Sequence, residues 1–209
     1  MVITDPAFLK GRDAVALGLA AVRGGATMVQ VRWKDGSARD LLALTQALVG
    51  ALPLSVPVLV NDRVDVALAA GAAGAHLGQD DVPPPAIRAR TPPGFLLGTS
   101  VGNPAEAGRA RDWPVDYWSI GSCYVTANKP DAGAPLGPGG FAALRRLAPP
   151  GMPVIGIGGI NVSNAGAIVT AGATGVAVIG AVLGAEDVEA ATRQLRTALG
   201  PAPSRFPSP

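Results

Sequence analysis

The sequence contains very little cysteine and histidine, and this scarcity restricts its metal and redox chemistry. Its 209 residues include a single cysteine, Cys123, and a single histidine, His76. One cysteine cannot form a disulfide within the chain, and neither a cysteine-based metal site nor a cage of two histidines can be assembled. One histidine also leaves a single candidate for acid–base chemistry by an imidazole ring.

The chain also has few aromatic residues, a small net charge and no long apolar run. Aromatic residues make up 4% of the chain, the net charge is +2, and the 17 basic residues are scattered along it. A nucleic-acid-binding protein would show a basic face with interleaved aromatics, so we expect no nucleic-acid partner. No apolar run reaches the ~18 residues of a membrane span. The chain enters strand-like sequence without a basic region, which predicts no signal peptide and a cytoplasmic protein.

What the chain does have is a regular alternation of two kinds of segment. Hydrophobic residues form 48% of it, enough for a sizeable core. Short aliphatic runs alternate with helical stretches rich in Ala, Leu and Arg, which is typical of parallel strands wrapped by helices. Strands are expected at Val2–Thr4, Thr27–Val31, Pro57–Val60, Ala73–Leu77, Leu96–Thr99, Tyr117–Ile120, Pro153–Gly156 and Thr174–Ile179. Helices are expected to begin near Asp13, Ser37, Val64, Pro84, Asn103, Pro138, Val162 and Gly184.

This alternation predicts a closed barrel in preference to an open sheet. The units recur every ~20–25 residues, as a barrel of this length requires. The competing architecture, an open doubly wound sheet, usually has about five or six strands. We therefore predict an α/β fold, a single-domain (β/α)8 TIM barrel, over residues 1–199. Residues 200–209 are expected to form a disordered tail.

Glycine-rich loops follow the seventh and eighth expected strands. The first contains Gly158 and Gly159, and the second contains Ile179 and Gly180. Glycine lets backbone N–H groups approach an anion closely, and these two loops form the usual phosphate site of such barrels. The alternative is that Gly158 and Gly159 only make a tight turn. The two loops together favour phosphate binding, which identifies a ligand group and not a reaction.

A basic cluster follows the second strand. Gln30, Arg32 and Lys34 occupy alternate positions, so they share one side of the strand. Arg binds a phosphate through two parallel hydrogen bonds, and Lys adds a positive charge. If the strand directs them to the mouth of the barrel, they form a second anion site. The alternative is an exposed strand end with solvated charges.

Carboxylates follow the third and fourth strands, in Asn61-Asp62 and in the Gln-Asp-Asp run at 79–81. Asp62 and Asp81 come from adjacent strand ends and are expected to hold one Mg2+ through oxygen ligands and waters. The ion would then bridge to the phosphates of a ligand. The alternative is that each aspartate caps the helix that follows it.

Signals for nucleophilic or acid–base chemistry are weaker. His76 lies on the fourth strand, where a buried histidine held by a neighbour is the commoner case. Ser100 offers a hydroxyl after the fifth strand, but no second histidine lies near it in sequence. The long polar loop at 121–129 is expected to close as a lid. Lys129, within that loop, is assigned to anion binding in preference to a Schiff base.

Together these positions resemble the thiamine phosphate synthase family, whose pattern can be followed along the whole chain. Its specific pieces are Gln-x-Arg-x-Lys at 30–34, Asn-Asp at 61–62 and His-Leu-Gly-Gln-Asp-Asp at 76–81. Gly-Ile-Gly-Gly-Ile at 156–160 also fits, although many phosphate-binding barrels share it. The resemblance implies a transferase. Pyrophosphate would leave an aminopyrimidine methyl diphosphate, and the ring nitrogen of a thiazole phosphate would attack the pyrimidine cation.

The resemblance also implies a role for each matching residue. A dissociative step needs charge stabilisation of the leaving group more than a strong base. The implied ligands of Mg2+ are Asp62 and Asp81. The implied catalytic residues are Arg32, Lys34, Lys129 and Ser100. The implied substrate contacts are these four together with Gln30, Asn61, Thr126, Asn128, Gly158, Gly159, Ile179 and Gly180.

The chain departs from the family pattern in three places. The family usually has Gly-Pro-Ile-Tyr-Pro-Thr-x-Thr-Lys after the sixth strand, whereas this chain has Gly-Ser-Cys-Tyr-Val-Thr-Ala-Asn-Lys at 121–129. Loss of two prolines leaves that loop less preorganised. Gly180 replaces a usual serine, and Gly102 replaces a common histidine. The Asn128 amide and a glycine N–H can still bind phosphate.

Other functions stay open at this point. A thiazole tautomerase shares the barrel and the thiazole-phosphate site, but it relies on a histidine where this chain has Gly102 and generally lacks the acidic run at 79–81. A non-catalytic binder of thiazole phosphate would explain the altered loop at 121–129. A sugar-phosphate isomerase would need Asp5 and Asp62 as a facing acid–base pair. The sequence does not fix the oligomeric state, and a homo-oligomer stays open.

Overall fold

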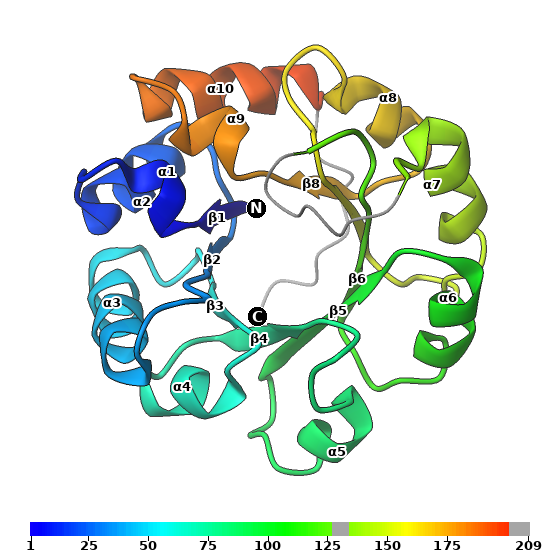
Figure 1. The fold of residues 1–209 in the computed structure, drawn as a ribbon, viewed down its shortest axis with the longest axis horizontal. Helices are drawn as coiled ribbons and strands as arrows, with labels where there is room; N and C mark the ends of the chain where they lie inside the picture. Colours follow the sequence, from blue (N-terminus) through cyan, green and yellow to red (C-terminus); the bar gives the residue numbers. More distant parts are fainter. Residues whose placement is uncertain (127–133, 201–209) are drawn as a thin grey trace.

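Eight parallel strands pair in sequence order in this computed structural model, which describes residues 1–126 and 134–200. The helices surround the strands as an outer ring (Figure 1). The strands are β1 (Val2–Thr4), β2 (Val29–Val31), β3 (Val58–Asn61), β4 (Gly74–Leu77), β5 (Leu96–Val101), β6 (Tyr117–Ile120), β7 (Val154–Ile157) and β8 (Gly175–Ala177). The helices are α1 (Pro6–Leu9), α2 (Ala14–Arg23), α3 (Ala38–Ala51), α4 (Val64–Ala69), α5 (Pro84–Arg88), α6 (Pro104–Ala110), α7 (Gly137–Arg145), α8 (Ala165–Thr170), α9 (Gly180–Leu183) and α10 (Val188–Ala198).

The sheet closes between its last and first strands. Val2 forms a parallel bridge with Val178, and the N–H of Ile3 donates to the carbonyl of Val178 at 2.9 Å. The predicted (β/α)8 barrel is therefore confirmed, and the open doubly wound sheet is excluded. None of the helices in the described ranges has the length and hydropathy of a bilayer span. Most of the predicted tail, residues 201–209, lies outside the described residues.

The expected elements are found with small shifts and two omissions. β1 and β6 have the predicted bounds, and the other strands differ by one or two residues at one or both ends. The short helices α1 and α9 were not expected, because four residues are too few for a helical period. The helix starts predicted near Val162 and Gly184 are wrong: α8 begins at Ala165 and α10 at Val188.

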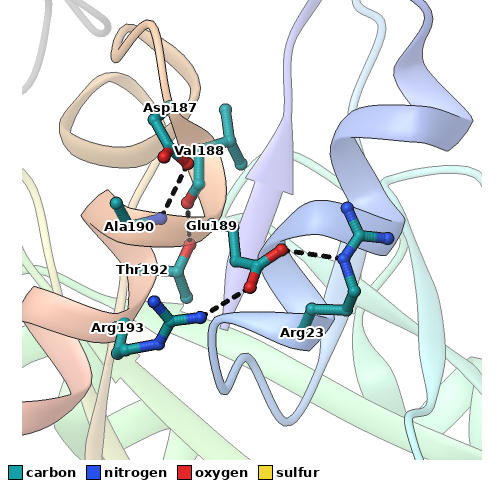
Figure 2. Close-up of polar contacts among 7 residues, drawn as sticks. All are labelled: Arg23, Asp187, Val188, Glu189, Ala190, Thr192 and Arg193. Carbon is teal, nitrogen blue, oxygen red and sulfur yellow. Dashed lines mark hydrogen bonds and ion pairs between the residues drawn. The ribbon is translucent and has the colours of Figure 1, made fainter.

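Side-chain caps explain where several helices begin. The Asn161 carboxamide oxygen accepts hydrogen bonds from both the N–H and the hydroxyl of Ser163, which holds a turn ahead of α8. Asp187 accepts the N–H of Ala190 at 2.9 Å and so starts α10 (Figure 2). Ser37 and Asn103 cap α3 and α6, as their residue types indicated.

Alternation along the strands separates two apolar layers. One layer lies between the sheet and the helices, and Val29, Val60, Leu97 and Trp118 are fully buried in it. The other layer fills the barrel itself and contains Ile3, Leu59, Tyr117, Ile155 and Ala177. Because the interior is filled, the ligand site has to lie at one end of the barrel, where the loops gather.

The outer ring is also joined where the chain's first long helix meets its last. Arg23 of α2 donates to Glu189 of α10 at 2.8 Å, and Arg193 donates to the same carboxylate at 2.5 Å (Figure 2). The arginine side chains are 60% and 62% exposed. Such exposed pairs contribute little to stability, so the fold is stabilised mainly by burial of the two apolar layers.

One glycine in the barrel wall yields a test of this packing. A Cβ on Gly98 would lie 2.1 Å from the Tyr117 ring, which is buried and cannot retreat. We predict that Gly98→Ala lowers the free energy of unfolding by about 2 kcal/mol or more. The matched control is Gly108→Ala on α6, where a Cβ meets nothing within 4 Å. Gly108→Ala should stabilise the protein by about 0.5–1 kcal/mol. Urea unfolding measures both, and equal effects would contradict the packing described.

Candidate active site

The carboxyl ends of the strands bring the predicted polar residues to the inner side of the barrel. Asn61 is in register with His76 on the neighbouring strand. Gln30 is in register with Ile3 and Leu59, both members of the interior layer. Its side chain therefore faces inward, as the alternation of residues 30–34 predicts. Loops are numbered below by the strand that they follow.

Arg32 is held by a carboxylate of loop one. Its Nη1 donates to Oδ2 of Asp5, which directly follows β1. The two side chains are only 20% and 11% exposed, so water screens the pair weakly. The other oxygen of Asp5 accepts the N–H of Ala7 at 3.1 Å and caps α1. One carboxylate thus fixes both Arg32 and the start of α1, which makes Asp5 a poor candidate for the base of a sugar-phosphate isomerase.

Asp62 and Asp81 lie against each other at the ends of β3 and β4. Burial, and then the hydrogen bond and charge of Asp81, raise the pKa of Asp62 to about 6, while Lys34 and Arg32 oppose the rise. Asp81 also accepts the N–H of Gly78 at 2.6 Å, which aims its carboxylate back toward the barrel mouth. The acidic pair and the basic cluster after β2 therefore share one site.

The helix-capping alternative for these aspartates is wrong. The N-cap residue of α4 is Arg63 and that of α5 is Pro83, and neither helix has a side-chain cap. Both carboxylates are thus directed at each other and not at a helix end. The raised pKa of Asp62 reflects its burial first and the facing carboxylate of Asp81 second.

The donor set fits a hard divalent cation. Carboxylate oxygens are the ligands that Mg2+ prefers, and this ion commonly takes one or two carboxylates together with waters and substrate phosphates. Asp62 and Asp81 are such a pair. Among residues 1–126 and 134–200 no group of three or more His, Cys, Asp or Glu side chains could hold a metal ion. A cation here would depend on ligand phosphates to complete its shell.

A chain of hydrogen bonds crosses the barrel beneath the mouth. The Tyr117 hydroxyl lies 2.9 Å from Nδ1 of His76, and the nearby Gln30 amide opposes the rise in the Tyr117 pKa. Nε2 of His76 lies 3.0 Å from Oγ of Ser100. The Tyr117 and His76 rings also stack, with centroids 5.6 Å apart. The buried, neighbour-held histidine expected from sequence is therefore confirmed.

Burial fixes the charge states in this chain. It lowers the pKa of His76 to about 4, although the charge of Asp81 opposes this. Burial also raises the pKa of Tyr117 far above its usual range, while the hydrogen bond from Gln30 opposes the rise. His76 is therefore neutral near pH 7, with one ring nitrogen donating and the other accepting. If the Gln30 amide donates to Tyr117, then Tyr117 donates to Nδ1 and Nε2–H donates to Ser100.

The glycines of loop seven are required by the neighbouring loop. Gly158 and Gly159 have φ of +92° and +63°. A Cβ on Gly158 would lie 2.0 Å from Oγ of Ser122, and one on Gly159 would lie 2.4 Å from the carbonyl oxygen of Val125. The N–H of Tyr124 donates to the carbonyl of Gly158 at 2.9 Å. These glycines thus allow a turn and the close approach of loop six, and phosphate binding by their backbone stays a prediction.

Loop eight has a visible reason for its unusual glycine. Gly180 begins α9, and a Cβ there would lie 3.0 Å from Cε1 of Phe8. Phe8 therefore occupies part of the space that a serine side chain would need. Ile179 precedes Gly180 and is half-buried, as is Thr126 of loop six. Asn128 and Lys129, to which phosphate contacts were assigned, lie outside the described residues.

Three residues of the site were not assigned these roles from sequence. Asp5 was considered only as an acid–base residue, although it follows β1 directly as the other mouth residues follow their strands. Tyr117 has the inward position that alternation along β6 gives it. Gln79 donates from its amide to the carbonyl of Ser100 and accepts from Arg109 at 3.3 Å. The partners of these three residues are far away in sequence, so the contacts could not be predicted from neighbouring residues. Only their positions on or after a strand indicate that they lie near the site.

This geometry can be set beside known proteins. The family model described as thiamine monophosphate synthase matches residues 1–182. A thiamine-phosphate synthase of Roseiflexus sp. (strain RS-1) is 48% identical over 205 residues, which cover 96% of this chain and 85% of the relative. Another, of Moorella thermoacetica (strain ATCC 39073 / JCM 9320), is 44% identical over 187 residues and covers 89% of this chain and 88% of its own length.

Solved structures give the same indication. A thiamine phosphate pyrophosphorylase from Pyrococcus furiosus superposes with a TM-score of 0.84 at 35% identity, covering 95% of this chain and 94% of its own. An orotidine 5'-phosphate decarboxylase from Pyrococcus horikoshii OT3 has a TM-score of 0.70 at 14% identity, and this likeness concerns the fold alone.

The neutral state of His76 makes a prediction about stability. In the unfolded chain the ring binds a proton below about pH 6.5, whereas in the folded protein its pKa is about 4. Stability due to the buried neutral ring is therefore lost as the pH falls from about 6.5 toward 4, by on the order of 2–3 kcal/mol. Urea unfolding of the parent and of His76→Gln should show the difference between the two proteins shrinking over this range.

Comparison of the two proteins is necessary because Asp62 titrates in the same range. Its pKa is raised on folding, so its contribution has the opposite sign and favours the folded state at lower pH. That contribution is common to the parent and the variant, and subtraction removes it. A difference that stays constant from about pH 8 to about pH 4.5 would contradict a buried neutral His76.

Proposed function

The chain belongs to the thiamine monophosphate synthase family, and we propose that it joins an aminopyrimidine methyl diphosphate to a thiazole phosphate with release of pyrophosphate. It is a transferase that acts on small phosphorylated molecules. The observation that carries the proposed reaction is the acidic pair Asp62 and Asp81 beside Arg32 and Lys34. Two facing carboxylates next to two cations suit a metal-bound diphosphate better than a proton transfer.

The diphosphate is assigned to the half of the mouth between β2 and β4. Arg32 presents a guanidinium whose orientation is set by Asp5. Lys34 and the Asn61 amide add a positive charge and a hydrogen-bond donor. Asp62 and Asp81 would hold Mg2+, which supplies further positive charge to the diphosphate when bound. Lys129, outside the described residues, is assigned to the same diphosphate.

The proposed reaction breaks one bond and forms one. The bond between the pyrimidine methylene carbon and the diphosphate oxygen breaks, and its electron pair leaves with the diphosphate. The lone pair of the thiazole ring nitrogen then forms the carbon–nitrogen bond to the methylene carbon. Arg32 and Lys34 stabilise the charge that grows on the leaving group. No residue has to remove a proton from the attacking nitrogen, so a neutral, buried His76 is consistent with this chemistry.

Ser100 is assigned to the pyrimidine side of the mouth. In the tautomer whose Nε2–H donates to the Ser100 oxygen, Ser100 keeps its own O–H for a substrate. Gln30 lies near Tyr117, at the far end of the same chain. A donor fixed by neighbours costs less entropy on binding than a freely rotating one. The hydroxyl thus acts in the proposal as an oriented donor and not as a nucleophile.

The thiazole phosphate is assigned to the opposite half of the mouth. Gly158 and Gly159 of loop seven, and Ile179 and Gly180 of loop eight, would present backbone N–H groups to its phosphate. Thr126 and Asn128 of loop six would complete this half. A homo-oligomeric state stays open, and a cytoplasmic location and the expectation of no nucleic-acid partner stay predictions from the sequence.

The reaction is tested directly by product formation. The purified protein is mixed with both substrates, with Mg2+ or with a chelator, and thiamine phosphate is followed by mass. We expect product with Mg2+ and almost none with the chelator, because the acidic pair then repels the diphosphate. Absence of product with Mg2+, together with retained binding of thiazole phosphate, would contradict the proposal and favour a tautomerase or a non-catalytic binder.

The acidic pair is tested by single amide substitutions. Asp62→Asn and Asp81→Asn should each lower kcat/KM on the order of 100-fold. Neither should lower stability, because each substitution removes a repulsive carboxylate. The matched control is Asp80→Asn, an exposed neighbour in the same loop, which should keep its activity. A thiazole tautomerase or a binder would be indifferent to all three changes. Steady-state kinetics and thermal unfolding distinguish these outcomes.

A further inference from the structure

Arg12 joins two helix ends that lie far apart in the sequence. It follows α1, and its guanidinium donates to the carbonyls of Phe8 and Leu9 at 3.1 Å each. It also donates to the carbonyl of Ala185 at 2.9 Å and to that of Leu183. The first two carbonyls lie at the end of α1 and the other two at the end of α9. Figure 1 shows these two helices side by side in the ring outside β1 and β8.

The chemistry of this contact favours arginine. The last carbonyls of a helix have no partner within it and carry a negative partial charge. A guanidinium is a planar cation with five N–H donors in a fixed fork, so it can bind several such carbonyls in one arrangement. An ammonium group offers the charge without the fork. Arg12 is half-buried, and its Nε, Nη1 and Nη2 all donate to these backbone oxygens.

A second contact holds the other end of α9 against α1. The ring of Phe8 lies where a Cβ on Gly180 would come within 3.0 Å. α9 is therefore fixed at its first residue by Phe8 and at its last by Arg12. A helix of four residues has little stability of its own. Val182 and Leu183 are buried in the outer apolar layer, and these two contacts with α1 add to that packing in fixing the position of α9 and of loop eight before it.

We propose that Arg12 is a positioning residue that acts through α9 on the thiazole-phosphate half of the mouth. The inference rests on the proposed function, because Ile179 and Gly180 at the start of α9 are assigned to that phosphate. Arg12 touches no substrate in this account. Its contribution is to keep the backbone of loop eight in one position before the phosphate arrives.

The test separates the two substrates. Kinetics of Arg12→Gln and Arg12→Lys are measured while each substrate is varied in turn. Arg12→Gln should raise the KM for thiazole phosphate about 10-fold and leave the KM for the aminopyrimidine diphosphate within about two-fold. Arg12→Lys should fall between the parent and Arg12→Gln, because it keeps the charge and loses the fork. A general loss of folding would not select one substrate.

The matched control is Arg23→Gln. Arg23 also links an early helix to the last part of the chain, but it is exposed and lies on the outer ring (Figure 2). Both KM values of Arg23→Gln should equal those of the parent. Equal increases of the two KM values in Arg12→Gln, or no increase in either, would overturn the inference. Such a result would not affect the proposed function, which is tested on the parent.

A readout without activity completes the test. Amide hydrogen exchange at 179–186 should speed up in Arg12→Gln relative to the parent and to Arg23→Gln, because local opening of α9 becomes easier. If Arg12→Lys is the only variant that folds well, it takes the place of Arg12→Gln in this comparison and should show a smaller increase in exchange. The exchange measurement also applies if the parent forms no product, in which case the proposed function fails on its own. Unchanged exchange at 179–186 would overturn the positioning role of Arg12.

Discussion

Closure of the sheet between β8 and β1 is the constraint on which the rest of the structure depends. The bridge between Val2 and Val178 turns a twisted parallel sheet into a barrel. Because the strands are parallel, every carboxyl end lies at the same face, and closure makes loop one the neighbour of loop eight as well as of loop two. Asp5 can therefore reach Arg32 on one side, while Arg12 reaches the end of α9 on the other. Residues of the first and last units meet only because the ring is closed.

The same closure places charge at the mouth and keeps it out of the barrel. Inside, the layer around Leu59 and Tyr117 is apolar, and its polar members are neutral at pH 7 because burial penalises their charged forms. At the mouth, Asp62 is less deeply enclosed and faces both Asp81 and Lys34. An unbalanced acidic pair at this depth carries an electrostatic cost, and binding of a cation with an anionic ligand would relieve it.

Much of this arrangement is predictable from the sequence, because it depends on local patterns. Alternation of aliphatic residues predicts the strands, and a position after a strand end predicts Arg32, Asp62 and Ser100 as mouth residues. The pairing of Asp5 with Arg32 is not predictable in this way, because it depends on which loops become neighbours. The choice between capping and pairing for Asp62 likewise depends on the backbone: the residue has a φ of +63°, and Arg63 takes the N-cap position of α4.

The short helices mark the other limit of sequence analysis. α1 and α9 are each a single turn, and neither repeats an apolar position often enough to be recognised. Gly180 departs from the resembled family's usual serine, and only the position of Phe8 supplies a physical reason. The contact between Phe8 and Gly180 joins two loops that are far apart in the sequence, so it can be recognised only in the folded structure.

Calorimetric titration of inorganic pyrophosphate tests the central claim most directly, because it isolates the half of the mouth assigned to the leaving group. The account predicts binding in the presence of Mg2+ and affinity at least about 10-fold weaker with a chelator, since the acidic pair would then repel the ligand. Equal affinity under both conditions, or no binding in either, would contradict the assignment of Asp62 and Asp81 to a cation that faces Arg32 and Lys34.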